Sequence, residues 1–390
     1  MATLETFRTE TRAWLQDNCP EVIRGSGLSF AGGDKEPIQN EDFKSWFDAC
    51  VSRGYTVPSW PREYGGAELS PAEVKVLHEE MRAMRAPQPL VGMGYAMIGP
   101  TLLEMGDDEQ KARHLLRIAR GETRWCQGYS EPGAGSDLAA LQTRAVSDGD
   151  SYVVNGSKIW TSGADKADWI FCLVRTDPKA SKHEGISFVL FPMDASGVTV
   201  KPIVLIAGTS PFCETFFDDV KVPKSERVGP ENRGWAIAKR LLQHERFSIG
   251  GPSAPSKANK LSSIAKQYVG ELGGKLADAN LRDDILKNEM SARAFKLTTQ
   301  RSAQENAKGE SITFATSMFK YYSTELTCEE DELKLKALGT QSLGWEGENF
   351  SRREIAITRS WLFDKALTIA GGSSEVQLNI IAKRVLALPD

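Results

Sequence analysis

The sequence has few residues of the kinds that build metal centres or disulfide frameworks. Its 390 residues include six cysteines and four histidines. No two cysteines form a CxxC pair, and the histidines share no HxxxH or HExxH spacing. Scattered cysteines of this kind are typical of reduced thiols, and metal ligands normally come at closer, regular spacings. We therefore predict no metal site and a cytoplasmic, reducing compartment.

An excess of positive charge is also missing. Lys and Arg together number 48 against 52 for Asp and Glu, which gives a formal net charge of −4. Proteins that bind nucleic acid or anionic membranes through their overall field carry a basic surplus. Neither kind of partner is predicted here, and any anionic ligand must be bound by local groups.

Long uninterrupted hydrophobic runs are absent as well. The longest charge-free run, from Ala86 to Leu103, contains three prolines and three glycines, which makes a single membrane-spanning helix implausible. A buried pair of short helices or a pocket wall is the better interpretation. At the start of the chain, Glu5 and Glu10 interrupt the basic and apolar layout that a secretion signal requires, so we expect a cytoplasmic protein without membrane insertion.

What is present predicts a multidomain α+β protein. At roughly 150 residues per domain, the length favours two or three domains. Residues 1–121 show apolar positions three and four apart, notably at 42–51 and 71–85, where Ser70 is a credible helix start. Residues 122–230 are instead rich in β-formers, and residues 231–390 again show helical spacing.

The middle segment predicts a β-barrel-like or sandwich domain, because short strand-like runs alternate with turn residues. A tight hairpin is expected within 151–160, with its turn at Asn155-Gly156. Further strands are expected at 168–176, 185–193, 198–203 and 214–222. The last third predicts a helix bundle, with helices at 235–249, 257–272, 277–308, 312–338 and 355–386.

Two motifs in the middle segment draw attention. Residues 130–137, SEPGAGSD, are rich in glycine, but Leu138 breaks the GxGxxG fingerprint and no Lys-Ser or Lys-Thr pair follows. A plain turn is the simpler interpretation, although free backbone amides and the hydroxyls of Ser130 and Ser136 could bind an anion or a ring edge. In residues 156–164, Trp160 stands beside two hydroxyl residues; taken alone it is expected in the core, like Trp125 and Trp169.

Three segments together resemble the signature blocks of acyl-CoA dehydrogenases. They are residues 129–137, 155–162 and 370–377, in the same order as in that family. The resemblance covers nearly the whole chain. It implies an N-terminal helical domain, a middle β-barrel-like domain and a C-terminal four-helix bundle, with FAD between the last two. The implied reaction is dehydrogenation of an acyl-CoA thioester to the trans-2-enoyl-CoA.

The resemblance also implies roles for particular residues. Gln127, Tyr129 and Ser130 would contact the flavin edge, Trp160 would cover the flavin face, and Ser162 would donate a hydrogen bond near N5. Ser136 would face the CoA pyrophosphate or pantetheine. The positions that would reach the ADP part of FAD, often across a subunit boundary, are Gln341, Gly344, Ser373 and Glu375.

The catalytic base is the most informative position. Many family members carry it in the C-terminal block, where this chain has Gly371, which cannot remove a proton. The branch that resembles isovaleryl- and long-chain-type dehydrogenases places a glutamate before an arginine on the first bundle helix, and Glu245-Arg246 fits that pattern. Glu245 is thus the expected base and Arg246 the expected CoA contact. The alternative is that both are ordinary surface charges.

One expected motif is missing. Family homotetramers usually carry Arg-x-x-Phe-Gly on the next bundle helix, and residues 261–286 contain only Arg282, with no Phe-Gly after it. We therefore expect either a homo-oligomer or a heterotetramer in which a related subunit supplies the arginine. An electron-transfer flavoprotein or a similar acceptor is the expected redox partner.

Two other functions are open at this point. The chain could be an oxygen-using flavoenzyme of the same fold, or a non-catalytic subunit that stabilises a partner. Residues 87–103 could line the acyl cavity, and the small pair Gly371-Gly372 favours a branched or bulky acyl group.

Overall fold

The computed structural model describes residues 3–249, 260–307 and 315–389, apart from the side chains of 243–249, 303, 306–307 and 315–316. The chain divides into two compact units. The first comprises residues 1–203 and 211–244, and the second comprises residues 204–210 and 245–390. The division falls inside helix α6 (Gly234–Ile249), after His244.

The first unit begins with helices. They are α1 (Leu4–Asn18), α2 (Glu41–Arg53), α3 (Pro71–Met84), α4 (Gly99–Met105) and α5 (Asp108–Ala119). The predicted start of α3 is confirmed: the Ser70 hydroxyl accepts from the Glu73 backbone, and the Glu73 carboxylate accepts in return from the Ser70 N–H. This capping box satisfies two of the backbone donors that a helix leaves unpaired at its start.

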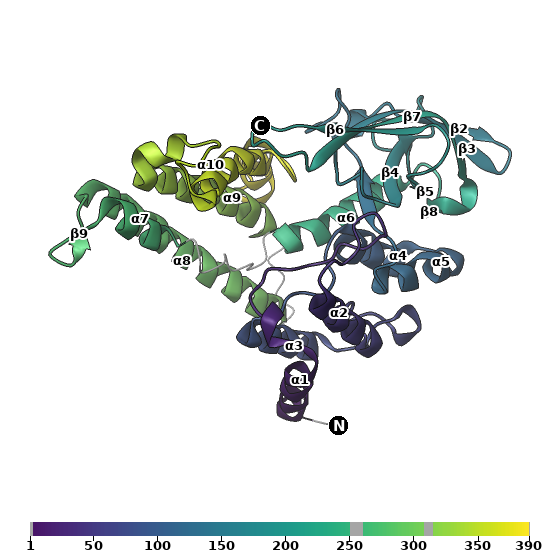
Figure 1. Ribbon diagram of the computed structural model, residues 1–390. Helices are drawn as coiled ribbons and strands as arrows, with labels where there is room; N and C mark the ends of the chain where they lie inside the picture. Colours follow the sequence, from purple (N-terminus) through teal and green to yellow (C-terminus); the bar gives the residue numbers. More distant parts are fainter. Residues whose placement is uncertain (1–2, 250–259, 308–314, 390) are drawn as a thin grey trace. The chain divides into compact units, whose positions relative to one another are not determined.

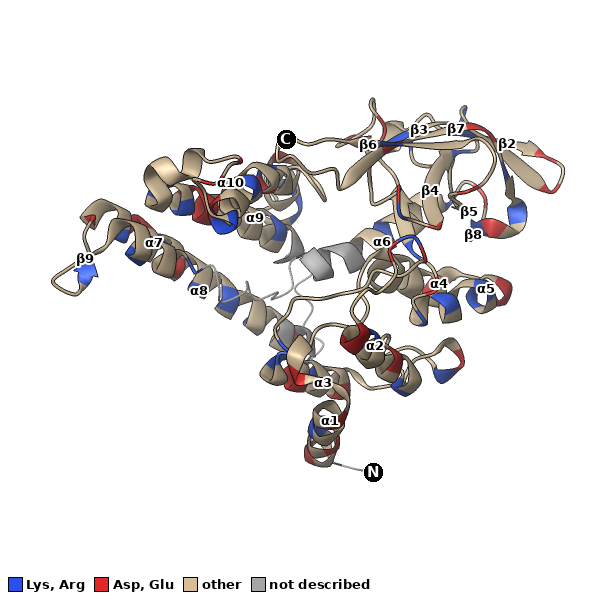
Figure 2. Cartoon of the chain, viewed as in Figure 1, with Lys and Arg blue, Asp and Glu red and all other residues tan. Residues whose placement is uncertain are grey.

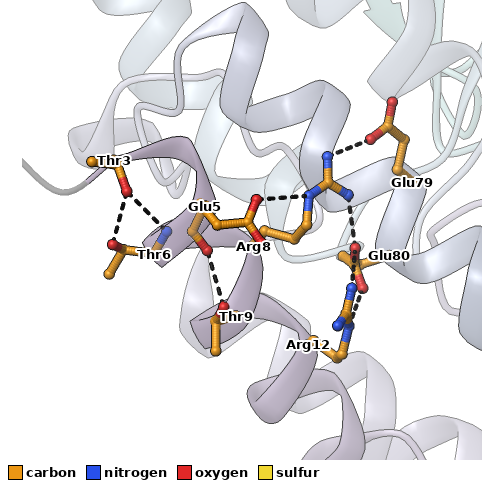
Figure 3. Close-up of polar contacts among 8 residues, drawn as sticks. All are labelled: Thr3, Glu5, Thr6, Arg8, Thr9, Arg12, Glu79 and Glu80. Atoms are coloured by element: carbon orange, nitrogen blue, oxygen red, sulfur yellow. Dashed lines mark hydrogen bonds and ion pairs between the residues drawn. The ribbon is translucent and has the colours of Figure 1, made fainter.

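An ion-pair network joins α1 to α3 (Figure 3). The Glu80 carboxylate is 5% exposed and accepts from Arg8 at 2.8 Å and from Arg12 at 2.7 Å. Arg8 also donates to Glu79 at 2.7 Å. The pKa of Glu80 lies below its ordinary range chiefly because of the hydrogen bond from Arg12.

The charge-free run folds as two short helical segments, as expected. Residues Gly94–Ile98 form a π-helical turn that leads directly into α4. Gly99 packs so closely on the Trp60 ring that a Cβ there would lie 2.3 Å from ring carbons. Among residues 3–249, 260–307 and 315–389, no helix is long and apolar enough to cross a membrane.

The middle of the chain forms one mixed sheet (Figure 1). Its strand order is β6-β7-β3-β2-β4-β5-β8, and β1 pairs in parallel with β4. The strands are β1 (Trp125–Gly128), β2 (Arg144–Asp148), β3 (Ser151–Ser162), β4 (Trp169–Arg175), β5 (Ile186–Pro192), β6 (Val198–Ile203), β7 (Phe212–Pro223) and β8 (Arg227–Val228).

The predicted hairpin turn at Asn155-Gly156 is wrong, because β3 runs through both residues. The chain turns earlier, at Gly149, which has a φ of 55°. Gly156 instead lies at an irregularity in the pairing of β3 with β7 and passes so close to Thr143 that a Cβ would meet its side chain at 2.7 Å. The glycine is required by this close approach and not by a turn.

Helix α5 is fixed to the sheet by a buried acid. Glu226, just before β8, accepts from Arg113 and lies 3.0 Å from Nε2 of His114. The His114 ring packs edge-on against Trp125 and Trp169, with centroids 5.2 and 4.6 Å away. These contacts place β1 and β4 against the N-terminal helices.

The second unit is mainly helical. Its helices are α7 (Leu261–Val269), α8 (Ala279–Ala307), α9 (Ala315–Leu338), α10 (Arg352–Asp364) and α11 (Ser374–Ile380). Figure 2 shows basic and acidic residues interspersed along these helices. Two expectations are corrected: the helix predicted to end at 272 stops at Val269, and the helix predicted over 355–386 is broken, since Gly371 and Gly372 have φ values of 66° and 95°.

The end of α10 carries an acid with an unusual pKa. Burial, together with the neighbouring Asp331 carboxylate, raises the pKa of Asp364 to about 7. An unfolded aspartate has a pKa near 3.9, so the folded state holds a proton that the unfolded state loses as the pH rises. Stability is therefore lost between about pH 4 and pH 7. We expect Asp364→Asn to stabilise the protein at pH 8 by about 1–2 kcal/mol, a value reduced for partial exposure, and by less as the pH falls toward 4.

Thermal unfolding at several pH values measures this effect. Glu332→Gln is a matched control, because Glu332 of α9 is 54% exposed and pairs with Lys365, the residue that follows Asp364. An exposed pair of this kind contributes little, so the control should show no pH-dependent gain. A pH-independent difference for Asp364→Asn would contradict the prediction.

Candidate functional site

The candidate site in the first unit starts on β1. Gln127 pairs with Phe171 of β4 and is half-buried. Its amide Nε2 is inaccessible to solvent and has no hydrogen-bond partner among the described residues. A buried amide of this kind is costly to leave unpaired, so it points to a ligand group.

The glycine-rich loop after β1 is a turn with an open tip. Glu131 and Ala134 exchange two backbone hydrogen bonds of 3.0 Å, which closes the turn. A Cβ added to Gly133 or Gly135 would meet nothing within 4 Å, and Ser136 is exposed. The predicted turn is confirmed, and its glycines leave backbone amides accessible to a ligand.

Trp160 does not lie in the core. Its side chain is 53% exposed and contacts Phe212 edge-on, with ring centroids 6.0 Å apart. Its φ is 60°, a left-handed conformation that a bulky side chain rarely adopts. Trp125, by contrast, is 3% exposed and lies in the core as predicted. An exposed aromatic ring held in a strained backbone is typical of a ligand-binding position.

The structure brings several predicted residues of the first unit together. The Ile159 N–H donates to the Ser130 carbonyl at 2.8 Å, which joins the start of the loop to β3. Ser162 ends the same strand and pairs with Phe212 of β7. Tyr129 is buried, with its ring edge-on to Phe171 at 6.0 Å.

A second group of predicted residues lies in the second unit. Gln341 belongs to a short helix, Gly339–Leu343, and its buried Oε1 has no hydrogen-bond partner among the described residues. Gly344 follows, and a Cβ there would clash with Phe350 at 2.3 Å. Ser373 caps α11, and the pKa of Glu375 is lowered by its own backbone N–H and by the Ser373 hydroxyl. Both segments pack against α9.

Glu245 and Arg246 cannot be placed in the same way. Both lie within α6, but their side chains fall outside the described part of the chain. Their roles remain sequence-based predictions.

Residues that sequence reasoning missed lie beneath this site. Lys158 and Glu131 are buried and form an ion pair of 2.8 Å. The alternation along β3 was the available signal: Tyr152 and Val154 point inward, and Lys158 continues their phase. A lysine predicted to point into a core requires an acidic partner, and Glu131 lies in the neighbouring motif.

Metal and thiol chemistry have no support in the described residues. No group of three His, Cys, Asp or Glu side chains is placed there to hold a metal ion. All six cysteines are buried thiols. Burial raises the pKa of Cys172 to about 12, so this thiol is not a nucleophile at neutral pH.

Comparison with known families matches most of the chain to three models. Residues 2–122 match the acyl-CoA dehydrogenase N-terminal domain, residues 126–220 match the middle domain, and residues 232–386 match the C-terminal domain.

Individual relatives agree with this result. The chain is 37% identical to acyl-CoA dehydrogenase IpdE1 of Mycobacterium tuberculosis, over 100% of this chain and 99% of the relative. It is 31% identical to the Tcur3481-Tcur3483 steroid ACAD, with a TM-score of 0.77 and coverage of 99% and 97%. The ChsE4-ChsE5 complex of Mycobacterium tuberculosis gives 31% identity, a TM-score of 0.76 and coverage of 100% and 99%. The chain belongs to the acyl-CoA dehydrogenase family.

Proposed function

We propose that this enzyme removes the α proton of a bulky acyl-CoA thioester with Glu245 and yields the trans-2-enoyl-CoA. The Tcur3481-Tcur3483 enzyme, a structural neighbour at 31% identity, is a steroid acyl-CoA dehydrogenase, and this supports a large, rigid acyl group. The pair Gly371-Gly372, in the connection between α10 and α11, adds no side-chain bulk.

The cofactor is FAD, as in the family, and residues on this chain fit it. Gln127 and Gln341 each have a buried amide atom without a partner in the described chain. Gly133 and Gly135 leave open space, so a phosphate or ring edge can approach the backbone. We assign the flavin contacts to Gln127, Tyr129, Ser130, Trp160 and Ser162. Ser136 is assigned both to the cofactor and to the CoA part of the substrate. The contacts with the ADP part of FAD are assigned to Gln341, Gly344, Ser373 and Glu375.

The chemistry then divides between cofactor and protein. When bound, FAD supplies the acceptor for the β hydrogen and its electron pair. The Glu245 carboxylate takes the α proton, so that the Cα–Cβ double bond forms as both hydrogens leave. The exposed Trp160 ring would exclude water from one face of the bound flavin, and Ser162, two residues further along β3, would donate a hydrogen bond near N5. Arg246 is assigned to the CoA phosphates.

The backbone conformation at Gly371 favours Glu245, and not the position of Gly371, as the place of the catalytic base. Many family members carry their base at the position of Gly371. Here Gly371 has a φ of 66°, a left-handed conformation that disfavours a side chain at this position. The acid is therefore assigned to α6.

The observation that carries the proposal is the exposed, strained Trp160 beside the open glycine-rich loop. The test is anaerobic bleaching of the flavin by a panel of straight-chain, branched, dicarboxylic and steroid acyl-CoAs. We expect the fastest reduction with the bulky, ring-containing thioester. Faster reduction by a short straight-chain thioester would contradict the substrate class, and no bleaching by any thioester would contradict the reaction.

A separate steady-state turnover assay, carried out in air, distinguishes the electron acceptors. Turnover with ferrocenium or an electron-transfer flavoprotein, without release of hydrogen peroxide, is expected for a dehydrogenase. Stoichiometric peroxide in air would favour an oxygen-using enzyme instead.

A further inference from the structure

Beneath the glycine-rich loop lies a lysine with no access to solvent. Lys158 of β3 is 0% exposed. Its Nζ donates to the Tyr129 carbonyl at 3.1 Å and to Oε1 of Glu131 at 2.8 Å. A buried charge is retained only where other groups replace its lost hydration, so both contacts are needed to hold this ammonium.

Glu131 in turn closes the base of the loop. Its Oε2 accepts from the Gln142 N–H at 2.6 Å, and its Oε1 accepts from the Thr143 N–H at 2.9 Å. Burial raises the pKa of Glu131, but the charge and hydrogen bond of Lys158, together with the donors from residues 142 and 143, lower it by more. The carboxylate is therefore ionised at neutral pH and ties residue 131 to residues 142 and 143.

A second buried cation supports the same loop. Arg175 of β4 is 9% exposed and donates to the carbonyls of Ala139, at 2.7 Å, and Leu141, at 3.3 Å. The returning half of the loop is thus held from below, whereas Gly133 and Gly135 at its tip have open space around them. The loop is fixed at its base and accessible at its tip.

The ion pair also lies next to the strained tryptophan. Lys158 is followed by Ile159, whose N–H binds the Ser130 carbonyl, and then by Trp160 at a φ of 60°. The pairing of β3 with β7 is irregular between Lys158 and Thr161. A left-handed conformation is unfavourable for a residue with a bulky side chain, so nearby contacts must hold Trp160 in it.

We propose that Glu131 and Lys158 are a positioning pair that holds Tyr129, Ser130 and Trp160 in the flavin-binding arrangement before FAD binds. The proposal rests on the flavin contacts assigned to those three residues above. The pair itself touches neither cofactor nor substrate. Its role is to order the flavin-binding surface in the apoprotein, so that FAD binding does not include the conformational entropy lost when that surface becomes ordered.

The first test is the affinity of the apoprotein for FAD. Glu131→Gln keeps the size of the side chain and removes its charge, and Lys158→Met removes the ammonium. We expect each variant to bind FAD about 10- to 100-fold more weakly, the effect of losing a hydrogen-bonded charge, and to show an altered visible circular dichroism of the bound flavin.

Glu80→Gln is the matched control for a general loss of stability. Glu80 is also a buried carboxylate with charge-assisted hydrogen bonds, but it joins α1 to α3 (Figure 3). We expect it to lower the melting temperature without changing the FAD affinity. Lys182→Met controls for local charge, because Lys182 forms an exposed pair with Asp137 at the loop tip. Lys182→Met should leave the melting temperature and the FAD affinity unchanged.

Hydrogen exchange in the apoprotein gives a second readout that does not depend on bound flavin. In Glu131→Gln, the amides of Gln142, Thr143 and Ile159 should exchange faster than in the wild type, and in Lys182→Met they should not. Unchanged FAD affinity and unchanged exchange in Glu131→Gln and Lys158→Met would overturn the proposal.

Trp160→Ala separates this proposal from the assigned flavin site. If Trp160→Ala leaves FAD affinity and flavin dichroism unchanged, the assigned contacts are wrong. If Trp160→Ala changes them while the pair variants behave like Glu80→Gln, the contacts stand and the positioning role is wrong.

Discussion

Replacing Glu245 with glutamine is expected to slow reduction of the flavin by acyl-CoA about 10²- to 10⁴-fold, the range over which a positioned general base acts. Glutamine has nearly the same shape as glutamate but cannot accept the α proton. FAD content and the dissociation constant for the enoyl-CoA product should change little, because neither requires proton transfer. Stopped-flow bleaching with the best thioester of the panel measures the rate.

The design includes two comparison variants. Glu245→Asp keeps a carboxylate on a shorter side chain and should retain more activity than Glu245→Gln. Glu104→Gln removes the acid that pairs with Arg240 of α6 at 2.7 Å, so it perturbs the same helix without touching the base. An exposed ion pair contributes little to stability, so the rate of flavin reduction in Glu104→Gln should stay within about twofold of the wild-type rate. Unchanged bleaching in Glu245→Gln would remove Glu245 as the base.

Much of the fold was predictable because its signals are local. The capping pair Ser70 and Glu73 marked the start of α3, and the strands at 169–175 and 186–192 lay within one residue of their expected bounds. The prediction of a hairpin turn at Asn155-Gly156 was wrong because this dipeptide occurs in two structural settings. It turns a chain where no neighbour intervenes, but here the Thr143 side chain approaches so closely that only glycine fits within a continuing strand.

The site was predictable only in part, for a different reason. The motifs identified the residues, but the exposure of Trp160 and the burial of Lys158 depend on how β3 pairs with its neighbours. Tryptophan is normally buried and lysine normally exposed, so residue type alone gave the wrong expectation for Trp160 and none for Lys158. Alternation along β3 contained the information about Lys158, but the misplaced turn interrupted that pattern.

A large effect on FAD binding is also expected because this chain lacks the arginine of the Arg-x-x-Phe-Gly motif. Between α7 and α8 the structure has a short hairpin, β9 (Glu271–Leu272) paired with β10 (Lys275–Leu276). Its turn residues, Gly273 and Gly274, have φ values of 58° and 74°, which is typical of a tight two-residue turn. The hairpin extends beyond α7 in Figure 1 and carries the exposed Leu272, but no arginine. This segment therefore offers no guanidinium to a FAD pyrophosphate.

We propose that a related subunit supplies this group, a proposal supported by similarity to the ChsE4-ChsE5 complex at 31% identity. The chain expressed alone should then bind FAD about 10- to 150-fold more weakly than the assembly, the effect of losing one charge-assisted contact of about 1.5–3 kcal/mol. Purified from its native host through a tag on this chain, it should carry a second acyl-CoA dehydrogenase chain with an Arg-x-x-Phe-Gly motif.

Three measurements test that assembly: the subunit masses by native mass spectrometry, the FAD content by absorbance, and the turnover with and without the second chain. Replacing the motif arginine of the second chain with lysine is the decisive variant, because lysine keeps the charge but cannot form the bidentate contact with a phosphate. It should lower FAD retention in the assembly while leaving the subunit masses unchanged. A homo-oligomer of this chain with a full complement of FAD and undiminished turnover would contradict the heteromer, and the cross-subunit arginine would then be unnecessary for this branch of the family.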